Sequence, residues 1–233
     1  MKNKLKILIL LFFIFIFFVN YILNKKEYFD DKKIKTHIVI SSCDDKDNVE
    51  QIKKLASSKM NCKFFVYNKC GNIKNSIKLK NVGREFHTFC YHIVKHYDNL
   101  PKKIIFIAST LEKHNRKKRL IYLLNNSDME YYCDFKYKPQ KIKNIPNNWK
   151  KYYYGKKSLY PANPQGFRPW YLKHIGEIDL NKKKCSNGIF MTSGKLLRKR
   201  PINFYKNLIQ QLEVDNSPEC VHYLERLVSV CFM

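Results

Sequence analysis

Apolar and polar residues follow one another along the chain in blocks that predict an N-terminal helix and then alternating strands and helices. Residues 7–23 form an apolar run that only Asn20 interrupts. After a charged stretch, the β-branched residues of Thr36–Ser42 predict a buried strand, and helical spacing over 49–56 follows an acidic loop. A strand, a loop and a helix in this order form the first unit of an α/β fold.

The next segments continue this alternation. Residues 62–67 predict a second strand, and residues 104–108 predict a third, fully apolar strand for the centre of the sheet. Between them, residues 86–97 carry apolar side chains at three- and four-residue spacing, which is typical of an amphipathic helix. This stripe leaves out His87 and His92, so we expect both rings at the surface or at the edge of a site.

Helical spacing recurs in 110–126, and the last third predicts a short strand over 185–192, a helix over 201–212 and a final helix from Ser217. Residues 128–166 are rich in Tyr, Lys, Asn and Pro and show no clean period. Such a long irregular segment in a compact domain is often a binding loop, whose aromatic rings could stack on sugars. The same rings could equally cover the sheet.

The N-terminal apolar run has about the length of a membrane span. Residues 7–23 approach the roughly 20 apolar residues that cross a bilayer, lysines flank them on both sides, and no small-residue cleavage site follows. We therefore expect residues 1–26 to be a single-pass signal anchor, 27–35 a short stalk and 36–233 one domain on the lumenal or extracytoplasmic side of the membrane. A cleaved signal peptide is the alternative.

The net charge of +26 invites a nucleic-acid interpretation. However, Lys far outnumbers Arg, and Asn, Ile and Tyr are also abundant, so A/T-rich codons account for the composition. The sequence also lacks the aromatic motif of an RNA-binding sheet and the spacing of a zinc finger. Nucleic acid is therefore not the expected partner, whereas acidic lipid head groups and sugar phosphates remain plausible ones.

The eight cysteines include no Cys-x-x-Cys pair, which gives a structural zinc site little support. Their even number permits disulfides in a lumenal domain, although the sequence leaves the pairing open. Cys90 falls on the apolar stripe of its helix and is expected to be a core thiol.

Polar residues gather at two places where α/β folds bind ligands. Asp44 and Asp45 follow the first strand, where open sheets bind nucleotides or metals, although an aspartate there could simply cap the helix. Asn81, Gly83 and Arg84 precede a helix whose first N–H groups lack partners and whose dipole favours an anion. A capped helix with a solvated Arg–Glu pair is the other interpretation.

The second group belongs to a longer pattern. Asn-x-Gly-Arg-Glu at 81–85, followed by Thr88, by Tyr-Asp-Asn-Leu-Pro at 97–101 and by an apolar strand, resembles domain-of-unknown-function family 3431. Related glycosyltransferase-like proteins of large DNA viruses and fungi are similar. Tyr-Leu-Glu-Arg at 223–226 agrees with this pattern, and the resemblance covers roughly residues 36–233. It implies a single Rossmann-like, glycosyltransferase A-like α/β domain.

The resemblance also implies a reaction, in which a sugar moves from a nucleotide sugar to a hydroxyl of a glycan or protein acceptor. In that fold an Asp-x-Asp after a central strand holds Mn²⁺ or Mg²⁺ against the diphosphate, but here Ser109 and Thr110 follow the strand. Three explanations stay open. The metal is held elsewhere, by Asp44 or Asp45, or basic side chains replace it, or catalysis has been lost.

Roles for individual residues follow from this resemblance. The residues expected to bind the nucleotide, its phosphates or the sugar are Asp44, Asp45, Asn81, Gly83, Arg84 and Thr88. Glu225 and Glu85 are the two candidates for the base that takes the acceptor proton, and Glu225 is preferred because it lies on a late helix beside the sheet. The alternatives are a non-catalytic membrane-anchored binding or structural protein that keeps the fold, and a basic module for nucleic acid or membrane surfaces.

Overall fold

The computed structural model describes residues 12–19, 36–126, 128–133, 142, 145, 159–177, 179, 185 and 188–233. The chain divides into two units, Met1–Lys35 and Thr36–Met233. In the first unit residues 12–19 are helical, while the remainder of the predicted span and the whole predicted stalk lie outside the described residues. Among the residues that are described, no helix has both the length and the apolar character needed to cross a membrane.

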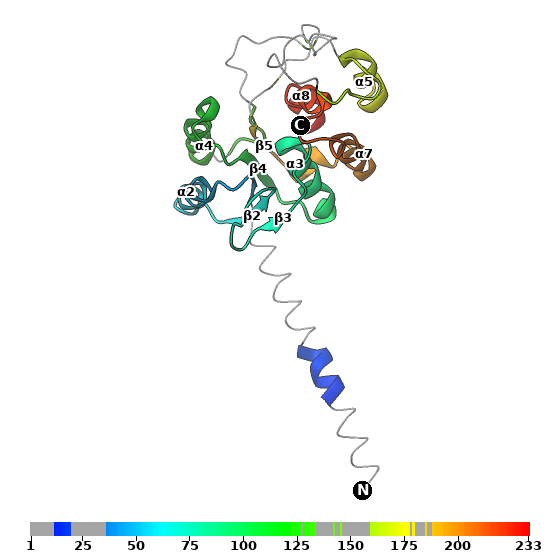
Figure 1. The fold of residues 1–233 in the computed structure, drawn as a ribbon. Helices are drawn as coiled ribbons and strands as arrows, with labels where there is room; N and C mark the ends of the chain where they lie inside the picture. The colour runs from blue at the N-terminus through cyan, green and yellow to red at the C-terminus, as the bar shows by residue number, and fades with distance from the viewer. Residues whose placement is uncertain are drawn as a thin grey trace, which may run out of the picture. The chain divides into compact units, whose positions relative to one another are not determined.

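A five-stranded sheet organises the second unit, with strand order β3-β2-β1-β4-β5 (Figure 1). Its strands are β1 (Thr36–Ser42), β2 (Cys62–Asn68), β3 (Ile77–Lys78), β4 (Lys103–Ala108) and β5 (Ile189–Thr192). The first four run parallel, and β5 runs antiparallel to β4. Every residue of β1 is buried, because this strand pairs with β2 on one side and with β4 on the other. The α/β fold class and the predicted strands at 36–42, 62–67 and 104–108 are thus confirmed, and β5 occupies the end of the strand predicted over 185–192. The centre of the sheet is β1, whereas the apolar strand β4 that was expected there lies beside it.

The order of the strands reverses at β1. From β1 the chain passes through α2 (Lys46–Ser57) to β2 and then outward to β3. Helix α3 (Arg84–Lys95) then returns it to β4 on the opposite side of β1. Connections that leave two neighbouring parallel strands in opposite directions open a crevice at their carboxyl ends, where α/β proteins bind ligands.

Helices cover both faces of the sheet (Figure 1). Residues alternate along β1, so that Ile38 packs with α2 and α4 (Arg116–Asn125) on one face. Val39 belongs to the other core, together with α3, α7 (Ile202–Leu212) and α8 (Glu219–Leu224). Cys90 is fully buried in this second core, as predicted.

Two predicted helices are divided. The region 110–126 begins with a short 3₁₀ turn, η2 (Lys113–Asn115), in which His114 has a positive φ, and continues as α4. The C-terminal helix ends at Leu224 and resumes as α9 (Val228–Cys231). Two further short elements connect strands and helices: the 3₁₀ turn η1 (Tyr97–Asn99) lies between α3 and β4, and the helix α6 (Gly194–Leu197) lies between β5 and α7.

Helix α5 (Phe167–His174) was not predicted. Its aromatic residues Trp170 and Tyr171 are buried in the core beside α8, so these rings cover hydrophobic structure. Tyr160, by contrast, is half exposed. The aromatic residues at 149–154 lie outside the described residues.

The prediction for the histidines of α3 was wrong. His87 and His92 are buried, because the sheet and α7 cover a wider part of this helix than its apolar stripe. The ring of His92 makes two polar contacts, to the Tyr67 hydroxyl at 2.9 Å and to His37 at 3.3 Å. These contacts provide for polar atoms that burial removes from water.

Gly83 determines how closely α3 approaches α7. Its φ is +57°, and a Cβ at this position would lie 2.6 Å from Leu212 Cβ and 2.9 Å from the Leu212 carbonyl oxygen. We expect Gly83→Ala to lower the free energy of unfolding by about 2–4 kcal/mol, because backbone strain and overpacking add. Gly176→Ala is the control, since Gly176 also has a positive φ but nothing lies within 4 Å of its Cβ position. Equal losses in urea denaturation of the two variants would contradict the packing argument.

Candidate functional site

A pocket of about 240 Å³ opens at the carboxyl ends of β1 and β4. The end of β1 and the turn after it contribute Ser41, Ser42 and Cys43 to its wall, and the turn after β4 contributes Ser109 and Thr110. The start of α3, the η2–α4 region and the loop before α8 close the other sides. The pocket therefore occupies the place where the strand order reverses.

Basic side chains dominate the lining. Lys69, Arg84, Lys113 and Arg116 line the pocket, and Glu85 is the single carboxylate in the described part of this lining. Ammonium and guanidinium groups in a concave site attract anions and bind phosphate oxygens with charge-assisted hydrogen bonds. The lining suits an anionic ligand.

Two glutamates hold the arginines of the pocket in place. Arg84 Nη1 lies 3.1 Å from Oε1 of Glu225, and Arg84 Nε lies 3.8 Å from Oε2 of Glu85. The other oxygen of Glu85 is 3.8 Å from Nη2 of Arg116. Gly188, just before β5, makes room for this last pair, since a Cβ there would lie 2.7 Å from Glu85 Oε1. The charges of three segments far apart in the sequence thus meet in one network.

Burial and charge change the acidity of these groups. Burial alone would raise the pKa of Glu225, but contact with His222 and the charge of Arg84 lower it overall. Burial lowers the pKa of Arg116, and the charge of Glu85 opposes this effect. The pKa of His114 is also lowered, first by burial and then by nearby arginines. Glu225 is therefore an ionised partner for Arg84 and a weak base.

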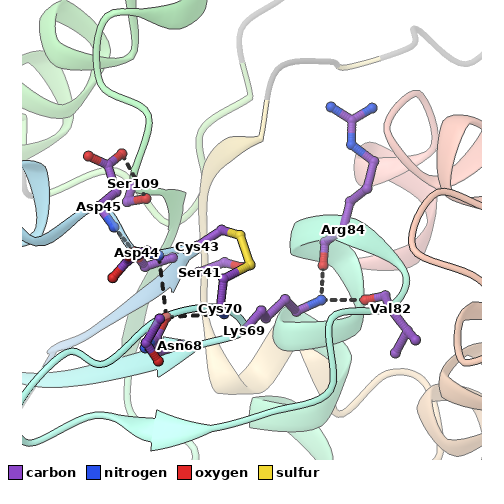
Figure 2. The surroundings of a disulfide bond; sticks show 12 residues. Ser41, Cys43, Asp44, Asp45, Asn68, Lys69, Cys70, Val82, Arg84 and Ser109 are labelled. Atoms are coloured by element: carbon purple, nitrogen blue, oxygen red, sulfur yellow. Dashed lines mark hydrogen bonds between the residues drawn. A yellow bond between two sulfur atoms is a disulfide. The ribbon is translucent and has the colours of Figure 1, made fainter.

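Arg84 itself has a strained backbone, with a φ of +45°. A side chain in this region costs about 1–3 kcal/mol, and such strain clusters at ligand-binding sites. Lys69 supports the strained turn, because its Nζ donates hydrogen bonds to the carbonyl oxygens of Val82 and Arg84 (Figure 2). A disulfide between Cys43 and Cys70 fixes the loop beside this lysine.

The two predicted aspartates do not line the pocket. The carboxylate of Asp45 accepts hydrogen bonds from Asn48 Nδ2 at 2.9 Å and from Ser109 Oγ at 3.2 Å, and so joins the turns after β1 and β4 (Figure 2). Asp44 is exposed and lies against Gly71. Asp45 therefore supports the wall of the pocket from outside.

The start of α3 is only partly available as an anion site. Asn81, Arg84 and Glu85 line the pocket. However, the N–H groups of Gly83 and Arg84 donate to the carbonyl oxygens of Asp215 and Asn216, at 2.8 and 3.0 Å. Arg84 can thus offer its side chain, whereas the backbone of Gly83 serves the packing of α3.

Thr88 lies deeper than predicted. It is fully buried, and its hydroxyl accepts a hydrogen bond from Ser41 Oγ at 3.0 Å. This bond joins α3 to the end of β1 beneath the pocket. Thr88 therefore contributes to the position of α3.

Comparison with known proteins identifies the family of this chain. A family profile described as protein of unknown function (DUF3431) matches residues 38–220. The chain belongs to this family. The region matched by DUF3431 includes every residue that lines the pocket, whereas Glu225 lies beyond it. No curated protein matches the chain.

Sequence reasoning missed several pocket residues of this DUF3431 domain. Lys69 follows β2 as Asp44 follows β1, so its position after a strand was a usable signal. Arg116 stood in a basic run that resembles any solvated helix face, yet it is buried. Asn216 carried no local signal, because only folding brings it to the site.

The residues around the pocket do not fit a divalent metal ion. Mg²⁺ and Mn²⁺ prefer carboxylate, carbonyl and water oxygens. Here the carboxylates of Glu85 and Glu225 face arginines, and no group of three or more His, Cys, Asp or Glu side chains in the described part of the chain could hold a metal. Positive charge at this site comes from side chains.

The two disulfides, Cys43–Cys70 and Cys133–Cys185, differ in their exposure to solvent. Cys43 is exposed, whereas Cys133 and Cys185 are buried. We expect a mild reductant to open Cys43–Cys70 first in the native protein, measured by alkylation of the freed thiols and mass spectrometry. Simultaneous opening of both bonds would contradict the assignment of exposure.

The Cys43–Cys70 bond closes a loop over 27 residues. Replacing both cysteines, Cys43→Ser with Cys70→Ser, should therefore lower the free energy of unfolding by about 3–4 kcal/mol.

Proposed function

We propose that this protein is a membrane-anchored glycosyltransferase that moves a sugar from a nucleotide sugar to an acceptor hydroxyl. The observation that carries this proposal is the basic pocket at the point where the strand order reverses. Open α/β sheets bind nucleotides at this point. The diphosphate of a nucleotide sugar would supply the negative charge that the lining lacks.

In this reaction the acceptor oxygen forms a bond to the anomeric carbon, and the bond from that carbon to the diphosphate breaks. Arg84, Lys113 and Arg116 would stabilise the charge that develops on the departing diphosphate. This arrangement supports transfer that uses cationic side chains in the place of Mn²⁺ or Mg²⁺.

The proton of the acceptor hydroxyl needs a base. Glu85 is the better candidate, because it lines the pocket and its contacts to the arginines are 3.8 Å long. Glu225, the candidate preferred from the sequence, pairs with Arg84 at 3.1 Å and has a lowered pKa. We therefore assign Glu225 the role of positioning Arg84.

The proposed location follows from the apolar run at 7–23, which would anchor the enzyme in a membrane with its domain on the lumenal or extracytoplasmic side. Two disulfides in the domain support an oxidising compartment. A glycan or a protein in that compartment would be the acceptor.

A non-catalytic binding protein is the second candidate. It is favoured by one observation, that both glutamates near the pocket face arginines, which weakens each of them as a base. Such a protein would bind an anionic sugar derivative without turning it over.

Thermal unfolding of the full-length chain with a panel of nucleotide sugars tests the binding step. A ligand at about 100 times its Kd stabilises the native state by about 2.7 kcal/mol, which raises the melting temperature measurably. Lys113→Met should weaken binding about tenfold, because it removes one charge-assisted contact from an exposed wall of the pocket. Lys53→Met is the matched control, since Lys53 pairs with Glu50 on α2 and does not line the pocket.

Release of nucleoside diphosphate distinguishes the enzyme from the binding protein. Glu85→Gln should lower the rate of release by about 10²–10⁴-fold while nucleotide-sugar binding persists, because it removes the base and keeps the shape. Binding without release in the unmodified protein would favour the non-catalytic candidate. A folded protein whose melting temperature no nucleotide sugar raises would overturn the proposal.

A further inference from the structure

Lys69 combines two features that seldom occur together. Its side chain is 93% inaccessible to solvent, with a relative exposure of 7%, and yet it lines the basic pocket. Removing an ammonium group from water is costly unless a partner compensates the charge. The groups around Lys69 therefore decide how readily its amine carries a charge.

The partners of Lys69 provide dipoles and little negative charge. Nζ donates to the carbonyl oxygens of Val82 and Arg84, in the turn that begins α3 (Figure 2). Glu85, the one carboxylate among the described residues that line the pocket, also faces Arg84 and Arg116. Negative charge near Lys69 is therefore shared among several cations.

This environment changes the acidity of the lysine. Burial lowers the pKa of Lys69 to about 7, although the charge of Glu85 acts in the opposite direction. A large part of the protein molecules would then carry a neutral amine at neutral pH. An anion in the pocket would favour the ammonium form, so that anion binding and proton uptake become linked.

Other ionisable groups near the lysine or across the pocket could add a pH dependence. These groups are Arg84, Glu85 and His87 of α3, and Lys113, His114 and Arg116 of the η2–α4 region. The pKa values of His87 and His114 are lowered from the ordinary value of 6.5. Burial thus favours the neutral imidazole in both histidines.

We propose that Lys69 binds the phosphate group of the pocket's ligand as an ammonium ion, so that the ligand binds together with a proton at neutral and alkaline pH. This inference rests on the proposed function, in which the pocket takes a phosphate-bearing ligand. The lysine also holds the turn that presents Arg84, so one side chain joins ligand contact to the position of its neighbour. Ligand release would return the proton to solvent.

Calorimetric titration of the full-length protein with inorganic sulfate tests the linkage, since sulfate stays a dianion over the whole range. Ionic strength is held constant, because screening alone changes anion affinity. We expect the affinity to fall about 50-fold between about pH 7 and about pH 9, following the fraction of ammonium. Titrations in two buffers of different ionisation enthalpy should show that the protein takes up close to one proton for each sulfate bound near the upper end of this pH range.

Three variants test whether the pH dependence of sulfate binding comes from Lys69. Lys69→Arg keeps its charge throughout and should bind sulfate with an affinity that no longer depends on pH above 7, because arginine stays protonated. Lys69→Met should bind weakly at every pH. His114→Gln should keep the slope of the unmodified protein above pH 7, because burial favours the neutral form of His114.

The unmodified protein makes the test independent of how well the variants fold. Sulfate binding that is flat from pH 7 to pH 9 without proton uptake would overturn the inference, and so would a slope that persists in folded Lys69→Arg. In both cases nucleotide-sugar binding at constant pH would leave the proposed function standing. Failure to bind sulfate at any pH also overturns the inference, and failure to bind nucleotide sugars as well would remove both proposals.

Discussion

Backbone hydrogen bonds from β1 to a parallel strand on each side fix the geometry of this domain. With both edges paired and both faces covered, β1 is buried along its whole length. A parallel strand needs a crossover connection to its neighbour, so α2 and α3 must lie on the faces of the sheet. One crossover leads away from β1 toward β2, and the other returns to β4. The pocket is a direct consequence of this reversal.

A second constraint is the concentration of positive charge at this edge of the sheet. Among the described residues that line the pocket, there are four basic side chains from three segments and a single carboxylate. Glu85 and Glu225 hold the arginines, and the carbonyl oxygens of the α3 turn hold Lys69. These contacts fix the cations without fully neutralising them. Contact with His222 and the charge of Arg84 lower the pKa of Glu225 despite its burial, and this weakens the glutamate as a base.

The strands were the most predictable part of the fold, because runs such as Thr36–Ser42 are buried on both faces and their β-branched residues have no other stable place. Helices were predictable where one face is buried, as in α7. Prediction was wrong for His87 and His92, since a helix between a sheet and another helix buries more than its apolar stripe. It also missed the break at His114, where a positive φ interrupts a sequence with helical spacing.

The sequence by itself determined the class of the fold, the places of its main strands along the chain and the gathering of Asn81, Arg84 and Glu85 at the start of one helix, because each depends on residues close together in the chain. Only the tertiary structure decided that Glu225 pairs with Arg84 and that Lys69 lies beneath the same turn. It also decided that Asp45 supports the wall of the pocket from outside, because its carboxylate, in the turn after β1, accepts a hydrogen bond from Ser109 in the turn after β4. The local sequence pattern specifies whether a segment forms a helix or a strand. The partner of a charged side chain, by contrast, depends on where distant segments meet.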